Sequence, residues 1–419
     1  MVNQTTPGLE AHLQAGPRAG YIGFDPTAPS LHIGNLATLQ LLLHFARAGH
    51  RPLALVGGAT GMIGDPSGKA AERTLQTAEA VAENVRGIAG QLAHIYQNAQ
   101  AMLGEAGWAP VQMVNNADWF GPMSVIDFLR DVGKTLTVSY MSAKDSVKSR
   151  LETGLSFTEF SYQLLQGFDF VHLHRAYGVT LQMGGADQWG NMTSGTEMLR
   201  RLDQAEGQVL TTPLVTKADG SKFGKSEGGN VWLDPARTSP YRFYQFWLNV
   251  GDDEVEGHLK RFTFLTQPLI AEAMAAHGQA PHLRGAQKLL AQQVTQLVHG
   301  AEALAAAQQA TDLLFSGGTW AAWQTLPEAT LLDVMDGVPH YALTQPGDDL
   351  LDCLSAGTDN KLFTSKGEAR RFIQNGGLAL NLQKVIGQEQ LAGMDRLCGK
   401  YILGQKGKKN FFLLELPTV

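Results

Sequence analysis

The chain has 419 residues, of which 44% are hydrophobic and 17% charged, and its formal net charge is −6. This composition excludes fibrous and intrinsically disordered proteins, and the length predicts two or three domains. No apolar stretch approaches the roughly 18 residues that a transmembrane helix needs, so no membrane association is expected. The two cysteines, Cys353 and Cys398, lie far apart without histidine partners, which argues against a disulfide scaffold or a zinc site and for the reducing cytoplasm.

The charge is distributed unevenly along the chain. Residues 355–419 contain ten Lys or Arg against five Asp or Glu, a local charge of +5, so the preceding 354 residues carry −11. An acidic body with a basic C-terminal segment suggests that the segment binds a polyanion. A basic surface that is merely solvated would have the same composition.

The first half of the chain alternates short apolar runs with helical patterns, which is typical of a parallel sheet covered by helices. Residues 20–25 form a first apolar run, leucines recur at a helical period from Leu36, and residues 53–56 form the next buried run. Together they predict one strand, helix, strand unit. A further strand is expected at 179–183, followed by a helix from about residue 190.

The pattern changes after residue 235. Residues 240–316 are helical in period, whereas residues 325–348 contain three prolines and little periodicity, which is typical of a linker. The sequence therefore predicts an α/β fold: a Rossmann-like, doubly wound catalytic domain, a helical domain, a linker and a small α+β domain. Their expected ranges are 1–236, 237–325, 326–348 and 349–419.

Residues 61–69 (GMIGDPSGK) superficially resemble a phosphate-binding P-loop. A Walker-type loop requires glycine where Ile63 stands and Ser or Thr where Ala70 stands. No Gly-x-Gly-x-x-Gly sequence follows the first strand either. The chain is therefore neither an ordinary P-loop protein nor an ordinary dinucleotide-binding protein.

The first strand is followed instead by residues 25–35 (DPTAPSLHIGN), which lead directly into a helix. The free N–H groups at a helix N-terminus attract anions, and Thr27 and His32 would add side-chain donors. Gly34 leaves room for a flat ring above the first turn. Ser30 acting as a simple helix cap, with a surface histidine after it, would explain the same residues.

Residues 158–170 read as an amphipathic helix with an unusual polar stripe. At a helical period, Tyr162, Gln166 and Asp169 fall within about 60° of one another. A phenol, an amide and a carboxylate on an otherwise apolar helix are costly unless something polar contacts them. A bound ligand or an internal hydrogen-bond network could supply these polar contacts equally well.

These motifs together resemble the tyrosyl-tRNA synthetases. Residues 32–35 (His-Ile-Gly-Asn) resemble the HIGH signature of class I aminoacyl-tRNA synthetases, and residues 222–226 (Lys-Phe-Gly-Lys-Ser) resemble the KMSKS signature that follows it. The stripe on residues 158–170 resembles the tyrosine pocket. The resemblance implies that L-tyrosine reacts with ATP to give tyrosyl-adenylate and pyrophosphate, and that tyrosine then passes to the 3′ end of tRNA(Tyr). It also implies Mg²⁺ arriving with ATP, no tightly bound cofactor and no protein metal site.

The resemblance also implies roles for individual residues. Tyr21 and Asp169 would bond the phenol of the substrate, and Gln188 would face its carboxylate. The residues expected to bind tyrosine are Tyr21, Asp65, Tyr162, Gln166, Asp169 and Gln188. Those expected to bind ATP, with Thr38, Gly185 and Asp187 at the ribose and adenine and Ser226 at the pyrophosphate, are Asp25, Gly34, Asn35, Thr38, Gly185, Asp187 and Ser226. Those expected to stabilise the phosphates during the reaction are Thr27, His32, Lys69, Arg73, Lys222 and Lys225. Asn35 departs from the second histidine of HIGH, which is expected to have a small effect.

Two further segments correspond to parts of the family. The basic C-terminal segment resembles a small RNA-binding fold, in which the expected RNA contacts are Lys366, Arg370, Arg371, Lys406, Lys408 and Lys409. Residues 115–160 correspond to the insertion through which these synthetases form homodimers, although a buried helical hairpin would look similar.

Two alternatives stay open from the sequence. One is a synthetase for another aromatic amino acid such as tryptophan, which would not require Tyr21 and Asp169 to converge on a phenol. The other is a catalytically inactive RNA-binding paralogue, which predicts loss of His32, Asp187, Lys222 or Lys225. All four residues are present.

Overall fold

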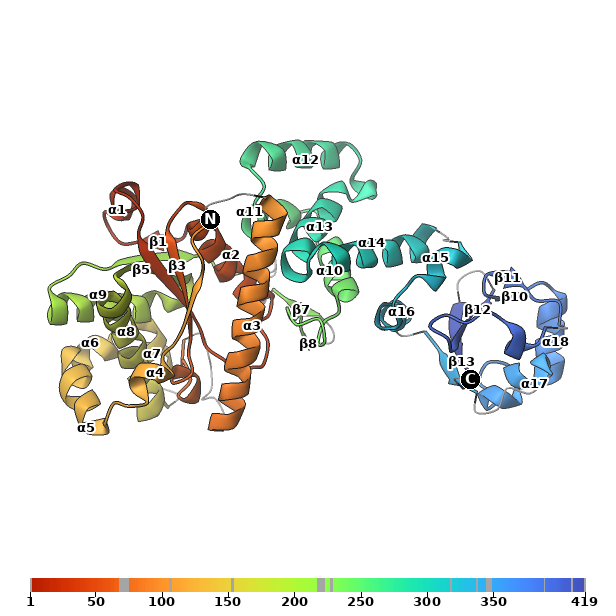
Figure 1. The fold of residues 1–419 in the computed structure, drawn as a ribbon, viewed down its shortest axis with the longest axis horizontal. Coiled ribbons are helices and arrows are strands. Elements are labelled where there is room, and N and C mark those ends of the chain that lie inside the picture. Colours follow the sequence, from red (N-terminus) through yellow and green to blue (C-terminus); the bar gives the residue numbers. More distant parts are fainter. Residues whose placement is uncertain are drawn as a thin grey trace. The chain divides into compact units, whose positions relative to one another are not determined.

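The computed structural model describes residues 2–67, 75–104, 108–151, 154–216, 223–226, 229–316, 319–336, 338–343, 349–387, 389–407 and 410–417. The chain forms two compact units (Figure 1). The first comprises residues 1–238 and 245–300, and the second comprises residues 239–244 and 301–419. Each unit has its own sheet and its own core.

A six-stranded sheet forms the centre of the first unit, in the order β1-β6-β5-β2-β3-β4. Strands β2 to β6 pair in parallel, and the short edge strand β1 is antiparallel to β6. The strands are β1 (Gln4–Thr5), β2 (Ala19–Phe24), β3 (Arg51–Val56), β4 (Gln112–Asn115), β5 (Val179–Gly185) and β6 (Gln208–Thr212). The predicted parallel sheet is confirmed.

Helices cover both faces of this sheet, because crossovers between parallel strands are right-handed and the strand order reverses direction at β5. Helices α2 and α3 therefore cover one face, and α8 and α9 pack together on the other. Strands buried on both faces need continuous apolar runs, and all residues from 52 to 56 are buried. The helices are α1 (Leu9–Gln14), α2 (Ile33–Arg47), α3 (Ala78–Leu103), α8 (Phe157–Tyr177) and α9 (Trp189–Asp203).

The reversal of strand order creates the position of the site. Strand β2 lies between β3 and β5, and the chain reaches these two neighbours in opposite directions. Ligands of doubly wound sheets bind at such a switch point, beyond the carboxyl ends of the strands. At this edge β2 is followed by Asp25, β3 by Gly57 and β5 by Ala186.

Short helices connect β4 to α8, and a second group of helices completes the first unit. The connection contains α4 (Ala117–Phe120), α5 (Val125–Asp127), a π-helix (Phe128–Val132), α6 (Val138–Ser142) and α7 (Asp145–Leu151). The strands β7 (Lys225–Ser226) and β8 (Gly229–Asn230) form a small separate sheet. The later helices are α10 (Pro240–Leu248), α11 (Val255–Phe262), α12 (Gln267–Gln279) and α13 (Gly285–His299).

The predicted helical segment is present, but its boundary differs from the prediction. Residues 245–300 belong to the first unit, where α13 packs against α3 and the Asn98 amide donates to the Leu297 carbonyl at 3.1 Å. Residues 301–325 belong instead to the second unit. A continuous helical period reveals the helices without revealing which core each one covers.

The second unit is built on a five-stranded sheet in the order β11-β10-β12-β13-β9. The strands are β9 (His340–Ala342), β10 (Leu378–Leu380), β11 (Gln383–Lys384), β12 (Tyr401–Lys406) and β13 (Asn410–Glu415). The helices are α14 (Ala301–Ser316), α15 (Trp320–Gln324), α16 (Glu328–Val334), α17 (Leu350–Leu354) and α18 (Lys366–Gln374). The predicted small α+β module is thus confirmed, with an additional strand, β9.

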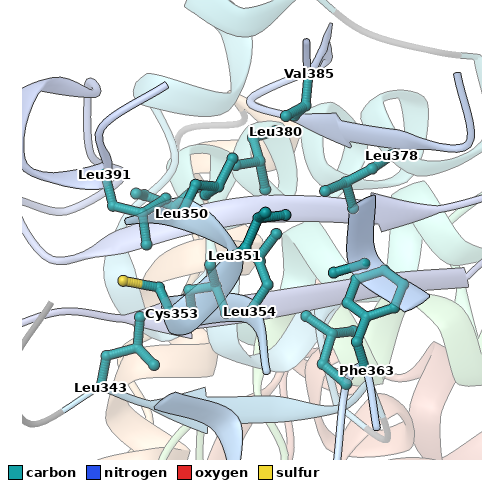
Figure 2. Packing of buried hydrophobic residues seen from close by; sticks show 14 of the residues in the cluster. Leu343, Leu350, Leu351, Cys353, Leu354, Phe363, Leu378, Leu380, Val385 and Leu391 are labelled. Carbon is teal, nitrogen blue, oxygen red and sulfur yellow. The ribbon is translucent and has the colours of Figure 1, made fainter. Parts of the chain in front are cut away.

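Both faces of this second sheet are buried. Along β12 and β13, Ile402, Phe412 and Leu414 belong to one core, which residues of α17 and α18 complete. Figure 2 shows Leu350, Leu351 and Leu354 of α17 in this core. The alternating residues Leu403 and Leu413 point into another core, which residues from α14 to α16 complete. Successive strand residues point to opposite faces, so an unbroken apolar run is what such a sheet requires.

The structure differs from the expected linker at 326–348. This range contains α16 and β9, and β9 pairs in parallel with β13 at the edge of the sheet. Two of its three prolines lie at element boundaries, since Pro327 is the N-cap of α16 and Pro339 immediately precedes β9, whereas Pro346 is outside the described residues. Proline is tolerated at both kinds of position, so the prolines did not mark a linker.

No helix in the described ranges is both long and apolar enough to cross a membrane. Neither Cys353 nor Cys398 forms a disulfide bond.

Candidate active site

The first candidate group lies at the start of α2. His32 is the N-cap, and its Nδ1 accepts a hydrogen bond from the Gly34 N–H at 3.0 Å. The Asn35 carbonyl oxygen Oδ1 accepts in return from the His32 N–H at 3.1 Å, which completes a capping box. The hydroxyl of Thr38 donates to the Asn35 backbone carbonyl at 2.9 Å. Asn35 therefore has a structural role in this helix start.

The structure brings the two signature motifs together. The Ile33 N–H donates to the Val231 carbonyl at 3.1 Å, and the Val231 N–H donates to the Gly224 carbonyl at 2.8 Å. Gly224 has a φ of +88°, and a Cβ there would lie 3.3 Å from the Cβ of Ile33. Glycine is needed for both reasons. The middle of the second motif thus lies against the first turn of α2.

The structure does not describe the side chains of several residues that are expected to contact the phosphates. Lys69, Arg73 and Lys222 lie outside the described residues, and Lys225 and Ser226 are described only as the backbone of β7. Phe223, between the two lysines of the motif, is buried against a cluster of rings.

His258 is the nearest member of that ring cluster, with its ring centroid 4.2 Å from that of Phe223. Both ring nitrogens of His258 are buried and have no partner in the described part of the chain. Burial, together with the nearby charge of Arg261, lowers the pKa of His258 to about 4. The ring is therefore neutral at physiological pH and packs as a hydrophobic group beside Trp247 and Phe262.

A buried carboxylate, Asp169, lies on α8. Asp169 is 1% exposed, and its two oxygens accept hydrogen bonds from the Trp119 indole N–H at 3.0 Å and the Asn116 amide at 3.2 Å. Burial raises the pKa of Asp169 well above its ordinary value, and these two bonds oppose the shift. The network orients both oxygens of the carboxylate.

The hydroxyl of Tyr21 lies within electrostatic range of Asp169. Burial, and secondarily the negative charge of Asp169, raises the pKa of Tyr21 well above 10. This hydroxyl is buried without a hydrogen-bond partner among the described residues. An unpaired buried hydroxyl is costly, so the arrangement favours a ligand that supplies the missing partner.

A second set of carboxylates lies at the carboxyl ends of β2 and β3. The Tyr162 hydroxyl donates to Asp25 Oδ2 at 2.7 Å, and the Thr60 hydroxyl donates to Asp25 Oδ1 at 2.7 Å. Burial raises the pKa of Tyr162 well above 10, and the charges of Asp25, Asp65 and Asp169 raise it further. Tyr162 is thus surrounded by three acidic groups, a setting that attracts a cation.

Asp65 is held by donors from three directions. It accepts from the Gln188 amide at 2.7 Å, the Asn191 amide at 3.2 Å and the Ser67 backbone N–H at 3.0 Å. The Gln188 amide also reaches Asp187 at 3.3 Å. A Cβ at position 185 would lie 2.6 Å from Asp187 Oδ1, so Gly185 allows this close approach.

Two glutamine side chains also present unpaired groups. The Oε1 atoms of Gln166 on α8 and Gln182 on β5 are buried and find no partner within the described ranges. Gln182 is the direct neighbour of Tyr21 in the paired strands β5 and β2. The unpaired atoms of Tyr21, Gln166 and Gln182 therefore belong to the paired central strands β2 and β5 and to helix α8, which packs on this sheet.

Thr27, another residue expected to contact the phosphates, lies between β2 and α2. Its backbone N–H donates to the Asp25 carbonyl at 2.9 Å, and its carbonyl accepts from the Gln76 amide at 3.0 Å. These bonds fix the turn between β2 and the start of α2.

Sequence reasoning missed Asn116, Trp119, Thr60 and Asn191. Asn116 is fully buried directly beyond β4, and it also bonds the Ala59 N–H and the Thr60 hydroxyl. Polar residues after the end of an apolar strand were the available signal, because this edge of the sheet holds the site. No comparable signal identified Trp119.

The predicted RNA contacts divide into two kinds. The Lys366 amine pairs with Asp349 and Asp352, at 3.2 Å and 2.5 Å. The Lys406 amine donates to the Leu362 carbonyl at 2.7 Å and lies 4.2 Å from the centroid of Phe363. Arg370 and Arg371 are exposed on α18, whereas Lys408 and Lys409 lie outside the described residues. Lys366 and Lys406 thus already have partners within the unit.

No group of three or more His, Cys, Asp or Glu side chains able to hold a metal occurs in the part of the chain that the structure describes.

Comparisons with known proteins show which proteins this chain is similar to. Residues 14–316 match the family description "tRNA synthetases class I (W and Y)", and residues 330–414 match "Tyrosine--tRNA ligase SYY-like C-terminal domain". The chain is 52% identical to a tyrosine–tRNA ligase of Porphyromonas gingivalis, over 99% of this chain and 97% of that protein. It is 50% identical to that of Cytophaga hutchinsonii, over 99% and 96%.

The chain also resembles solved structures. A C-terminally truncated mitochondrial tyrosyl-tRNA synthetase of Aspergillus nidulans matches with a TM-score of 0.67 and 30% identity, over 73% of this chain and 88% of that one. The corresponding protein of Coccidioides posadasii matches with a TM-score of 0.64 and 32% identity, over the same shares.

Proposed function

Because this chain belongs to the tyrosine–tRNA ligases, a family of class I tRNA synthetases, we propose that the buried cluster around Tyr21, Tyr162 and Asp169 binds its tyrosine. The chain joins L-tyrosine to tRNA(Tyr) at the expense of ATP, through tyrosyl-adenylate and pyrophosphate. The observation that carries the proposed site is the unpaired buried hydroxyl of Tyr21 within electrostatic range of the buried carboxylate of Asp169.

The two ends of tyrosine fit the two ends of this cluster. The phenol would donate to Asp169 and bond Tyr21, which supplies the partner that the Tyr21 hydroxyl lacks. The α-ammonium would lie among Asp65, Tyr162 and Gln166, where three carboxylates create a negative potential. Each charged contact replaces hydration that the ligand loses on entry, and hydrogen bonds with ionised partners are stronger than neutral ones.

ATP would bind across the start of α2. The side chains of Thr27 and His32 and the positive end of the α2 dipole would face the phosphates, with Asp187 and Gly185 at the ribose. The substrate carboxylate, facing Gln188, attacks the α-phosphorus directly and needs no protein nucleophile. The protein therefore contributes position and charge stabilisation, to which Lys222 and Lys225 would add positive charge at the leaving pyrophosphate. Mg²⁺ would enter with ATP, coordinated mainly by phosphate oxygens.

The decisive test is amino-acid-dependent ATP–pyrophosphate exchange on the full chain without tRNA. Tyrosine, phenylalanine and tryptophan are compared in separate reactions. We expect exchange with tyrosine far above that with either other amino acid. Exchange that follows tryptophan, or no exchange with any of the three, would contradict the proposed pocket.

We propose that tRNA contacts the exposed basic face of α18. Arg370 and Arg371 are its exposed arginines, and substituting both by glutamate lowers the net charge by four units on a surface that would bind phosphates. The double variant should keep tRNA-independent exchange and lose tRNA charging, and its remaining charging should depend less steeply on salt because phosphate contacts are lost. Equal loss of exchange and charging would mean that the substitutions act on folding.

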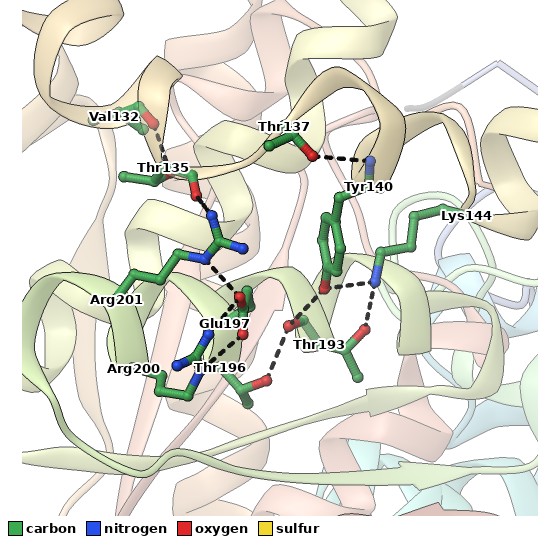
Figure 3. Close-up of polar contacts among 10 residues, drawn as sticks. All are labelled: Val132, Thr135, Thr137, Tyr140, Lys144, Thr193, Thr196, Glu197, Arg200 and Arg201. Atoms are coloured by element: carbon green, nitrogen blue, oxygen red, sulfur yellow. Dashed lines mark hydrogen bonds and ion pairs between the residues drawn. The ribbon is translucent and has the colours of Figure 1, made fainter.

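We also propose a homodimer formed through residues 115–160. Val125, Ile126 and Val138 in this segment are 73%, 69% and 70% exposed, which is unusual for large apolar side chains. The segment is held against α9, because the Lys144 amine donates to the Tyr140 hydroxyl and Thr193 Oγ1, and Arg201 donates to the Thr135 carbonyl (Figure 3). The chain has twice its monomer mass in light scattering if this is correct, and Ile126→Asp should return it to the monomer.

We further propose that the chain works in the cytoplasm, since neither of its cysteines forms a disulfide bond and its substrate is tRNA. Cell fractionation with antibody detection tests this location.

A further inference from the structure

His172, on α8, stacks on the ring that holds Asp169. The His172 imidazole and the Trp119 indole are nearly parallel, with an interplanar angle of 15° and a centroid distance of 4.3 Å. The same indole donates its N–H to Asp169 Oδ1 at 3.0 Å. Because Asp169 and His172 are three positions apart on α8, they project from the same side of the helix.

Trp119 on α4 contacts both Asp169 and His172 on α8, so the three side chains link the two helices. Trp119 comes from the single-turn helix α4, which is too short to orient an indole by itself. Its N–H is fixed by Asp169 and its face by His172, both from the 21-residue helix α8. The other oxygen of Asp169 is bonded by Asn116 at 3.2 Å. The histidine is thus the one aromatic contact to the Trp119 indole from α8 in the described ranges.

We propose that His172 is a positioning residue for tyrosine selection: by holding the Trp119 indole, it fixes the direction in which Asp169 presents its carboxylate to the substrate phenol. The proposal rests on the proposed tyrosine pocket and extends it to a residue that does not touch the substrate. The His172 ring is neutral, since burial and the nearby Arg175 lower its pKa, so the contact is a ring stack.

Three substitutions separate this role from a structural one. His172→Ala removes the stack, and His172→Phe restores an aromatic face. His174→Ala is the matched control, because His174 lies on the same helix but bonds the Val179 carbonyl at 2.9 Å, away from Trp119. Thermal unfolding of each variant records any general loss of stability.

The readout is the separate dependence of pyrophosphate exchange on tyrosine, phenylalanine and ATP in the full chain. For His172→Ala we expect the KM for tyrosine to rise about 2- to 12-fold, which corresponds to the loss of one aromatic stack. The KM for ATP should stay unchanged, and preference for tyrosine over phenylalanine should fall. His172→Phe should restore most of the tyrosine KM, and His174→Ala should leave it unchanged.

Three outcomes overturn the proposal: an unchanged tyrosine KM in His172→Ala, equal changes in the KM values for tyrosine and ATP, or the same effect from His174→Ala. If His172→Ala does not fold, His172→Gln takes its place, since it keeps much of the volume without an aromatic face, and the same outcomes apply. Failure of the proposed function is distinguishable, because the unsubstituted chain would then show no tyrosine-dependent exchange.

Discussion

Replacing Asp169 by asparagine would exchange one carboxylate oxygen for an amide donor in a position where both oxygens already accept. In the structure one oxygen receives the Trp119 indole N–H and the other receives the Asn116 amide. An asparagine can accept only one of these donors, so its own NH₂ group would face the other donor. Asn116 cannot turn its amide to compensate without losing the bond from the Ala59 N–H to its oxygen, at 2.7 Å.

The magnitude follows from the interactions that are lost with tyrosine bound. A hydrogen bond with an ionised partner contributes about 1.5–3 kcal/mol, so Asp169→Asn should lower kcat/KM for tyrosine activation about 10- to 150-fold. Phenylalanine has no hydroxyl to bond and should lose much less. The ratio of the two kcat/KM values should therefore fall by a similar factor.

The assay is pyrophosphate exchange with each amino acid, together with Asp118→Asn as the control. Asp118 is an exposed carboxylate next to Trp119 on the same short helix, so its substitution removes a charge without touching the pocket. If activation of phenylalanine and tyrosine fell by the same factor in Asp169→Asn, Asp169 would not contact the phenol and the reasoning would be refuted.

Three further predictions concern stability. Between pH 6.5 and about 4 the unfolded chain protonates His258 and the folded chain does not, so the free energy of unfolding falls by up to about 3 kcal/mol as pH is lowered through this range. His258→Phe should remove that part of the pH dependence, measured by urea unfolding at pH 5 and 7.5. An equal pH dependence in the variant and the unsubstituted chain would contradict this prediction. Glu159→Gln should destabilise the chain by about 3–5 kcal/mol in urea unfolding. The reason is that Arg150, which is 4% exposed and pairs with Glu159 at 2.8 Å, would become an uncompensated buried charge. Breaking the exposed pair of Arg130 with Asp127 is the control, and equally small losses of stability from both substitutions would refute the argument. A chain ending at residue 344 should bind a hydrophobic dye and aggregate, because it removes β12 and β13 from the core that α14 to α16 cover; a monomeric, dye-free product would show that these helices fold without the sheet.

The parallel sheet was predictable because it depends on local patterns, and so was the burial of the polar stripe on α8. Apolar runs predicted β2, β3 and β5, and the polar stripe on α8 predicted Tyr162, Gln166 and Asp169. In the structure Tyr162 and Asp169 are buried at the edge where the strands end. Their assignment to tyrosine contacts stays a prediction.

Other features depend on pairings that no local pattern records. Asn116 and Trp119 come from a connection between elements, and their role exists only because α4 lies beside α8. The boundary near residue 300 was missed for a similar reason: helices before and after it have the same period but cover different sheets. The charges of Lys366 and Lys406 read as an RNA surface, yet Asp349, Asp352 and the Leu362 carbonyl are close only after folding.

The bridge between His32 and Trp232 has a consequence for the order of assembly during translation. The two residues are 200 positions apart, and the bonds around them close the first turn of α2 against the segment that follows β8. At about 5–20 residues per second, the ribosome needs about 10 to 40 s to synthesise the intervening chain. Helix α2 can form early from local contacts, but its N-terminus has no strand across it until residue 233 has emerged. The start of α2, where we propose that ATP binds, is thus completed only when more than half of the chain has been made.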